Sequence, residues 1–132
     1  IMTTRVLAAL AATAILLGGC NETITRTTTA GKPVLAYAMA MYTDGSCWSW
    51  EPPEVSVATP PANGRVAHAL VKAPLQMPGS KCDGQVVDAR VSLYKPNPGF
   101  RGQDRLTLLY DGIRNDGGGR FVTSKDVVID VK

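Results

Sequence analysis

The sequence of 132 residues has little of what a catalytic or metal centre needs, because it contains a single histidine, His68. It contains neither the nucleophile motif G-x-S-x-G nor the zinc motif H-E-x-x-H. A general base needs a second group that positions it, and one histidine leaves no independent set of such residues. We therefore expect a protein that is not an enzyme and holds no metal and no cofactor, with His68 as an ordinary strand residue.

Concentrated positive charge is also lacking. The chain carries 14 Lys and Arg residues against 11 Asp and Glu residues, and they are scattered without a basic run. Capture of nucleic acid by electrostatic attraction needs a basic patch or a basic helix, and the sequence predicts neither. We expect no nucleic acid among the partners.

The apolar stretch at residues 6–17 is too short for a permanent membrane span. A helix of this length reaches about 18 Å, whereas the hydrocarbon core of a bilayer is roughly 30 Å thick. Arg5 precedes the stretch, and Gly18 and Gly19 follow it. A charged start, a short apolar middle and a small-residue exit are typical of a secretory signal peptide.

The residues Leu17-Gly18-Gly19-Cys20 resemble the lipobox of bacterial lipoproteins. The resemblance implies that residues 1–19 are removed and that Cys20, acylated by diacylglycerol, becomes the new N-terminus. Two or three acyl chains, at ~0.8 kcal/mol per buried CH₂, would hold such a protein on its membrane. An ordinary signal peptide followed by a chance cysteine is the alternative. Asn21 stands where an aspartate would favour the inner membrane, so we expect the outer membrane, facing the periplasm or the cell surface.

The mature chain divides by composition near Pro33. Residues 20–32 are rich in threonine and poor in apolar side chains, which predicts the lipidated cysteine followed by a flexible, solvated tether. Within residues 33–132, short segments alternate between apolar and other side chains, which is typical of strands. The segments are 34–42, 54–59, 65–71, 85–94, 105–110 and 127–131.

A short helix is the alternative for residues 34–42, because alanine and methionine are helix formers. Turn residues cluster at 60–64, 96–99 and 116–119, and the chain holds nine prolines and thirteen glycines. The sequence contains no convincing long amphipathic helix. This pattern therefore predicts a single all-β domain, an antiparallel β-sandwich.

Two stretches of the domain resemble the Ig-like or cadherin-like domains of bacterial surface proteins. In that family a turn of the form P-x-N-G-x-V leads to Y-x-P-x-x-G-F-x-G-x-D, and residues 61–66 and 94–104 match both patterns. The resemblance implies an Ig-like fold. The matching residues of the second pattern are Tyr94, Pro96, Gly99, Phe100, Gly102 and Asp104.

The residue types of this motif predict a structural role. Gly99 and Gly102 permit positive φ, and Phe100 can close the open end of the sandwich. Asp104 can accept N–H bonds from the tight loop behind it. The chain departs from the family in carrying one copy, in lacking an acidic Asn-Asp-x-Asp stretch and in inserting residues 72–82 between strands. The missing stretch argues against calcium.

Cys47 and Cys82 remain as one possible pair in an exported chain if Cys20 is acylated. We expect a disulfide, which in the entropic model contributes roughly 3–4 kcal/mol to stability. A metal site or a catalytic thiol is the alternative, and it lacks histidine or acidic partners at ligand spacing.

Trp48 and Trp50 are two residues apart, so on a strand they share a face. Packing beside the disulfide, as the core tryptophan of Ig domains does, is the favoured interpretation. An exposed pair that stacks on a sugar ring or a partner's apolar edge is the alternative, and it is the best candidate ligand contact in the chain.

Three aspartates near the glycine-rich loop, Asp111, Asp116 and Asp126, could gather a calcium ion. Their spacing fits no dedicated calcium loop, which favours solvated turn residues.

The sequence as a whole favours a non-enzymatic binding or structural module that is anchored to a membrane of the cell envelope and contacts protein or glycan. The alternative is a small inhibitor or assembly factor for an exported enzyme or envelope complex, with the loop at residues 74–81 as the inserting element.

Overall fold

The computed structural model describes residues 22–114 and 119–132, so the lipobox, Cys20 and Asp116 lie outside the described residues. The described part is built from eight strands. It contains no helix long and apolar enough to cross a membrane. The strands are β1 (Thr23–Thr28), β2 (Val34–Tyr42), β3 (Ser49–Trp50), β4 (Glu54–Thr59), β5 (Gly64–Pro74), β6 (Val86–Pro96), β7 (Gly102–Arg114) and β8 (Gly119–Val131).

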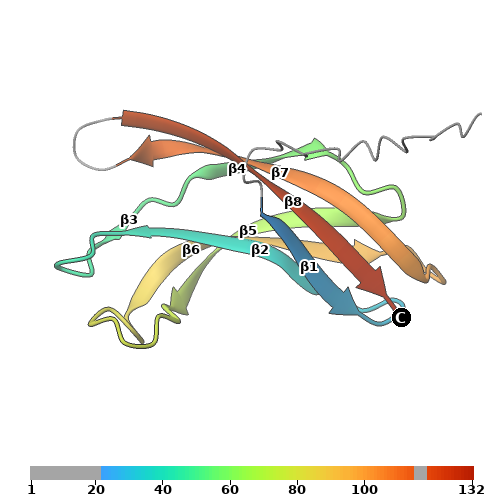
Figure 1. Cartoon of the computed structure of the whole chain (residues 1–132), viewed down its shortest axis with the longest axis horizontal. Coiled ribbons are helices and arrows are strands. Elements are labelled where there is room, and N and C mark those ends of the chain that lie inside the picture. The colour runs from blue at the N-terminus through green and yellow to red at the C-terminus, as the bar shows by residue number, and fades with distance from the viewer. Residues whose placement is uncertain (1–21, 115–118) are drawn as a thin grey trace, which may run out of the picture.

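The strands form two four-stranded sheets that lie as two layers (Figure 1). The first sheet has the order β1-β8-β7-β4, and the second has the order β3-β2-β6-β5. The predicted all-β class is confirmed, and residues 34–42 form a strand rather than a short helix. Each of the six predicted segments overlaps a strand, although β5 to β8 are longer than predicted and β3 was not predicted. The pairing is antiparallel except between β1 and β8, which run parallel.

The predicted tether is wrong for Thr23–Thr28, which forms β1 at the edge of the first sheet. Threonine is β-branched and fits a half-buried strand, and Ile24 supplies one apolar side chain that packs against the core. The Arg26 Nε–H also donates to the Ala36 carbonyl of the second sheet, at 3.1 Å. The folded domain therefore includes β1 and does not begin at residue 33.

The core lies between the two layers and is built from the inward-facing side chains of β2, β6, β7 and β8. These side chains alternate with outward ones, as the period of a strand requires. Tyr37 of β2 meets Tyr110 of β7 edge to face, with ring centroids 5.6 Å apart. The largest fully buried side chains of the core cluster are Tyr94, Tyr110, Leu106, Leu108, Ile129 and Val127.

The motif that resembles Ig-like domains joins the sheets at one end of this core. Asp104 of β7 is buried, and the Tyr94 O–H of β6 donates to its Oδ2 at 2.8 Å. The Ala62 and Asn63 N–H groups, between β4 and β5, donate to the same carboxylate at 3.0 Å each. Asp104 thus accepts backbone N–H bonds as expected, although the donors belong to the β4–β5 turn and not to the loop behind it.

The glycines of the motif occupy conformations that other residues disfavour. Gly99 has φ of +79° and Gly102 has φ of +132°. Phe100 between them packs against the core. At Gly64, a Cβ atom would lie 2.3 Å from the Tyr94 ring, so the turn needs glycine there for space.

The expected insertion at residues 72–82 begins as strand. Lys72 to Pro74 continue β5, which pairs with β6 over its whole length. The loop that follows, residues 75–85, is closed by the Gly84 N–H donating to the Leu75 carbonyl at 2.8 Å. The insertion is therefore a longer β5–β6 hairpin with a compact tip.

Candidate functional site

A disulfide joins the turn between β2 and β3 to the tip of the β5–β6 hairpin, as expected. Cys47 and Cys82 are bonded, with their Cα atoms 5.4 Å apart. Cys47 belongs to a turn after β2, in which its backbone N–H donates to the Thr43 carbonyl at 2.8 Å. The Cys82 side of the bond is fully buried in the β5–β6 tip. The disulfide fixes the segment that leads into β3.

The two tryptophans do not lie as the favoured interpretation requires. Trp48 precedes β3, in the turn, and its side chain is 69% exposed. Only Trp50 lies on the strand, opposite Met41 of β2, and it is half-buried. The Trp50 indole N–H donates to Thr43 Oγ1 at 2.6 Å, which fixes the ring. Neither residue belongs to the buried core, because the chain turns at residues 44–46 and carries them away from it.

A groove of about 590 Å³ opens beside Trp50. It is lined by residues 50–54, which lead from β3 into β4, by residues 111–113 of β7 and by Arg120 of β8. Figure 1 places β3 and the hairpin end of β7 and β8 at the same end of the molecule. The groove therefore lies where the chain passes from the second sheet to the first.

Proline and glycine shape the floor of the groove. Pro52 and Pro53 are buried, and proline fixes the backbone φ of this connection. Pro53 packs so closely on β7 that a Cβ atom at Gly112 would lie 2.7 Å from the Pro53 Cβ. Ile113, by contrast, is 69% exposed. An indole, two prolines and an isoleucine give the groove an apolar lining.

Charged groups stand around this lining. The Arg120 guanidinium donates two hydrogen bonds to the Asp111 carboxylate, and its Nε lies 2.8 Å from Oδ1. These bonds lower the pKa of Asp111 and raise the pKa of Arg120. Glu54 faces Arg90 at 3.4 Å, and Glu51 is exposed. The groove thus presents three carboxylates and one guanidinium of its own.

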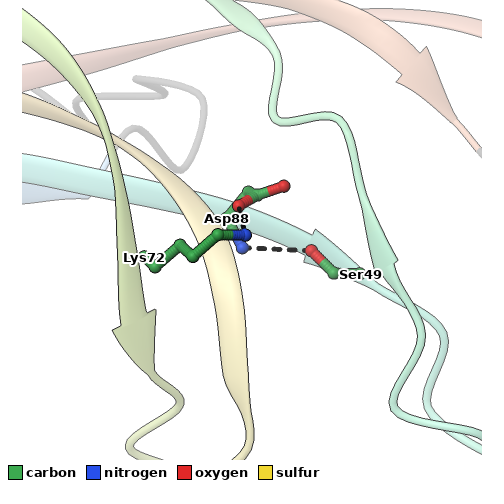
Figure 2. Close-up of polar contacts among 3 residues, drawn as sticks. All are labelled: Ser49, Lys72 and Asp88. Carbon is green, nitrogen blue, oxygen red and sulfur yellow. Dashed lines mark hydrogen bonds and ion pairs between the residues drawn. The ribbon is translucent and has the colours of Figure 1, made fainter.

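Three polar residues form a second cluster, which bridges three strands. Figure 2 shows the Lys72 ammonium of β5 directed at Asp88 of β6, 2.9 Å from Oδ1. The Asp88 backbone N–H donates to Ser49 Oγ of β3 at 3.0 Å. The cluster links β5, β6 and β3, and we assign its three residues a structural role rather than a binding role.

His68 lies on β5, opposite Ser92 of β6, and its Nδ1 is 2.8 Å from Ser92 Oγ. Partial burial and the Arg90 guanidinium lower the pKa of His68. The Ser92 side chain is fully buried. Among residues 22–114 and 119–132, no carboxylate accepts a hydrogen bond from the His68 ring, so the pair lacks the orienting residue of a catalytic triad there.

The two aspartates of the calcium hypothesis that the structure describes are engaged separately. Asp111 pairs with Arg120, and Asp126 accepts a hydrogen bond from Thr107 Oγ1 at 2.8 Å. In the described part of the chain, no three His, Cys, Asp or Glu residues are grouped so as to hold a metal ion.

The sequence singled out Trp50 as a ligand contact and Asp111 only as a possible calcium ligand, and it missed the rest of the groove. Its lining comes from segments about sixty residues apart along the chain, and no local pattern links them. Comparison with family models, with curated proteins and with solved structures gives no match.

Proposed function

We propose that this protein is a non-enzymatic binding module of the bacterial cell envelope, held on a membrane by lipid on Cys20, that contacts glycan or protein through the groove beside Trp50. The groove is the observation that carries the proposal. Binding sites are commonly concave and mostly apolar, with a few polar groups that fix the ligand's orientation. The groove combines these features on a disulfide-braced end of a β scaffold.

The strand order supports an Ig-like identity for the domain. With β1, β2 and β4 to β8 taken as strands A to G, the sheets read A-G-F-C and B-E-D, and β3 is an extra short strand. This arrangement is compatible with the Greek-key connections of Ig-like sandwiches. Such sandwiches present loops for binding at their two ends, and the groove lies at one of them.

Export is supported by the leader pattern and by the disulfide. Disulfides persist in oxidising compartments such as the periplasm and the cell surface. The lipobox resemblance at residues 17–20 then supports a lipid anchor and a location at the outer membrane. The membrane is thus one partner, through the acyl chains.

The chemistry of the groove favours a glycan over a protein segment. The apolar face of a sugar ring stacks on an aromatic side chain, and Trp50 is held in place by its bond to Thr43. Sugar hydroxyls donate hydrogen bonds, and carboxylates accept them without donating. Glu51, Glu54 and Asp111 supply such acceptors in the lining of the groove.

Single-tryptophan variants test this proposal. The full chain in detergent is titrated with soluble glycan strands prepared from peptidoglycan, and indole fluorescence is followed. In Trp48→Phe the remaining Trp50 reports on the groove, and we expect a saturable change in emission. In Trp50→Phe the exposed Trp48 remains, and we expect no saturable change. Saturable binding by Trp50→Phe would show that the groove is not the site.

A second candidate function, an inhibitor or assembly factor, is favoured by the compact tip at residues 75–85. Hydrogen bonds within this tip and the disulfide at Cys82 hold it in one shape, and Met77 at its surface is 39% exposed. A pre-ordered loop loses little entropy when it inserts into a partner. Stoichiometric capture of one exported enzyme, lost on Met77→Asp and kept in Trp50→Phe, would favour this function over the first.

A further inference from the structure

Strand β5 has an open edge along its full length. It lies at the end of the β3-β2-β6-β5 order, with β6 as its neighbour. It pairs with β6 through eleven consecutive residues without a bulge. Its other edge makes no backbone hydrogen bond to any residue that the structure describes. Such an edge exposes unpaired N–H and C=O groups to which another strand can bond.

The devices that usually prevent pairing are missing from the middle of β5. Proline occurs only at the last position, and the charged residues, Arg65 and Lys72, lie toward the two ends. Lys72 is bound to Asp88 of its own sheet (Figure 2). The remaining titratable group is His68, whose pKa is lowered by burial and by Arg90, so it is neutral at neutral pH. Residues 66–71 therefore bring no charge to the edge.

Between Val66 and Val71, β5 carries apolar side chains on both faces of the sheet, with His68 as the one exception. Ala67, Ala69 and Val71 share the outer face, and Val71 is 37% exposed. Val66 and Leu70 share the inner face, where Val66 contacts the core and Leu70 is 55% exposed. Leu70 remains exposed because β5 is the last strand of its sheet. A strand added beside β5 would bring side chains over both faces of this apolar edge.

We propose that β5 pairs antiparallel with β5 of a second copy of this chain, about a two-fold axis at Ala69, to form a continuous eight-stranded sheet. Ala69 is the midpoint of Gly64–Pro74, so this register pairs all eleven residues and leaves none over. Such an interface uses the same surface on both copies and closes as a dimer.

The side chains that this register brings together are compatible. Leu70 lies opposite the partner's His68, and Ala67 lies opposite the partner's Val71. Arg65 lies opposite the partner's Ala73, and Lys72 lies opposite the partner's Val66. No like charges face each other, whereas like charges directly opposite destabilise a strand pair. The self-complementary register is the reason for choosing a second copy over a foreign strand.

A cysteine at the two-fold axis tests the register. Residues directly opposite on antiparallel strands have Cβ atoms about 4.5–5.5 Å apart, near the reach of a disulfide. Ala69→Cys in the full chain should give a covalent dimer on non-reducing gels of intact cells, and reductant should remove it. Ala38→Cys is the matched control, because Ala38 is also exposed and shares the cross-strand row Ala38, Val91, Ala69. A monomeric Ala69→Cys, or equal crosslinking by Ala38→Cys or by the unchanged chain, would overturn the proposal.

A charge at the same position provides a second measurement. We expect light scattering to give twice the mass of one chain for the purified full chain in detergent. Ala69→Lys places two ammonium groups face to face and should give the mass of one chain. Ala38→Lys should keep the double mass, and circular dichroism confirms that both variants are folded. A single-chain mass for the unchanged protein, alone or with a different protein bound, would show that β5 does not pair with itself.

Discussion

At the scale of single residues, the carboxylate of Asp104 connects three parts of the fold. It accepts the Tyr94 O–H from the second sheet and the Ala62 and Asn63 N–H groups from the β4–β5 turn. It also accepts the N–H of Arg105, at 2.9 Å. Buried groups of this kind stabilise a fold when they are fully hydrogen-bonded and cost stability when a partner is removed. Asp104 is therefore the polar group that holds the β4–β5 turn and the two sheets together at this end of the core.

We predict that Asp104→Asn destabilises the domain by roughly 2–4 kcal/mol, because the amide presents an NH₂ group where N–H donors converge. Tyr94→Phe, which removes one hydrogen bond, should cost about 1 kcal/mol. Urea denaturation followed by circular dichroism measures both. Asp130→Asn is the control, because Asp130 accepts one exposed bond from Gln103, and its effect should be near zero. Equal effects of Asp104→Asn and Asp130→Asn would contradict the assigned role.

Buried tyrosines make the domain sensitive to alkali. Burial raises the pKa of Tyr110 to about 12, whereas a tyrosine of the unfolded chain ionises near its ordinary value of about 10. Between these values the unfolded state loses the proton first, so stability present below about pH 10 falls as the pH rises toward 12. Tyr110→Phe should show a smaller fall in the urea midpoint over this range than the unchanged protein. An identical fall in both would contradict the raised pKa.

At the scale of elements, alternation along the chain predicted the strands that pack on the core. Segments such as residues 54–59 and 105–110 alternate because one face of each strand meets the other sheet. Strand β1 was missed because its single apolar residue, Ile24, stands among threonines whose hydroxyls suggest a solvated spacer. The run of β-branched residues was the signal available in the sequence.

Hydrogen exchange distinguishes a strand from a tether for Thr23–Thr28. We expect the β1 amides that bond to β8 to exchange at least tenfold more slowly than those of an unstructured peptide of the same sequence. The reason is that amides in a sheet exchange only when the pairing opens. Ile24→Ala should speed this exchange, and Thr27→Ala, at an exposed position, should not. Exchange of the β1 amides at the rate of the unstructured peptide would show that Thr23–Thr28 is a tether and not a strand.

The disulfide between the β2–β3 turn and the β5–β6 tip is the covalent element of the fold. The double variant Cys47→Ser, Cys82→Ser should lose roughly 3–4 kcal/mol of stability in the entropic model, since the bond closes a long loop of the unfolded chain. Thermal unfolding of the oxidised protein, the reduced protein and the double variant measures this. The reduced protein and the double variant should agree. Equal stability of all three would contradict a stabilising role for the bond.

At the scale of the whole molecule, the groove arises only from the packing of distant segments. The sequence identified Trp50 as a candidate contact because Trp48 and Trp50 are two residues apart and could form an exposed stacking pair. It could not place Trp50 against Asp111 and Ile113, because the position of β3 depends on the turn after β2 and on the disulfide. The favoured interpretation, that the tryptophans pack in the core beside the disulfide, was wrong for the same reason, although Asp44-Gly45 is a turn signal shortly before Trp48.

The whole domain also bears on the proposed location at the cell envelope. A disulfide-linked pair of sheets, with a groove at one end and an open strand at another edge, is compatible with the proposed module of the cell envelope. The proposed membrane anchor and the disulfide require that the chain is exported, acylated and oxidised. These three events change the mass of the protein in ways that differ from one another.

Intact-mass analysis of the protein taken from its native cell tests this claim most directly. The account predicts a chain that begins at Cys20, carries the mass of a diacylglyceryl group with or without a further acyl chain, and gains two thiols only after reduction. A chain that retains residues 1–19, with free thiols at Cys47 and Cys82, would contradict it.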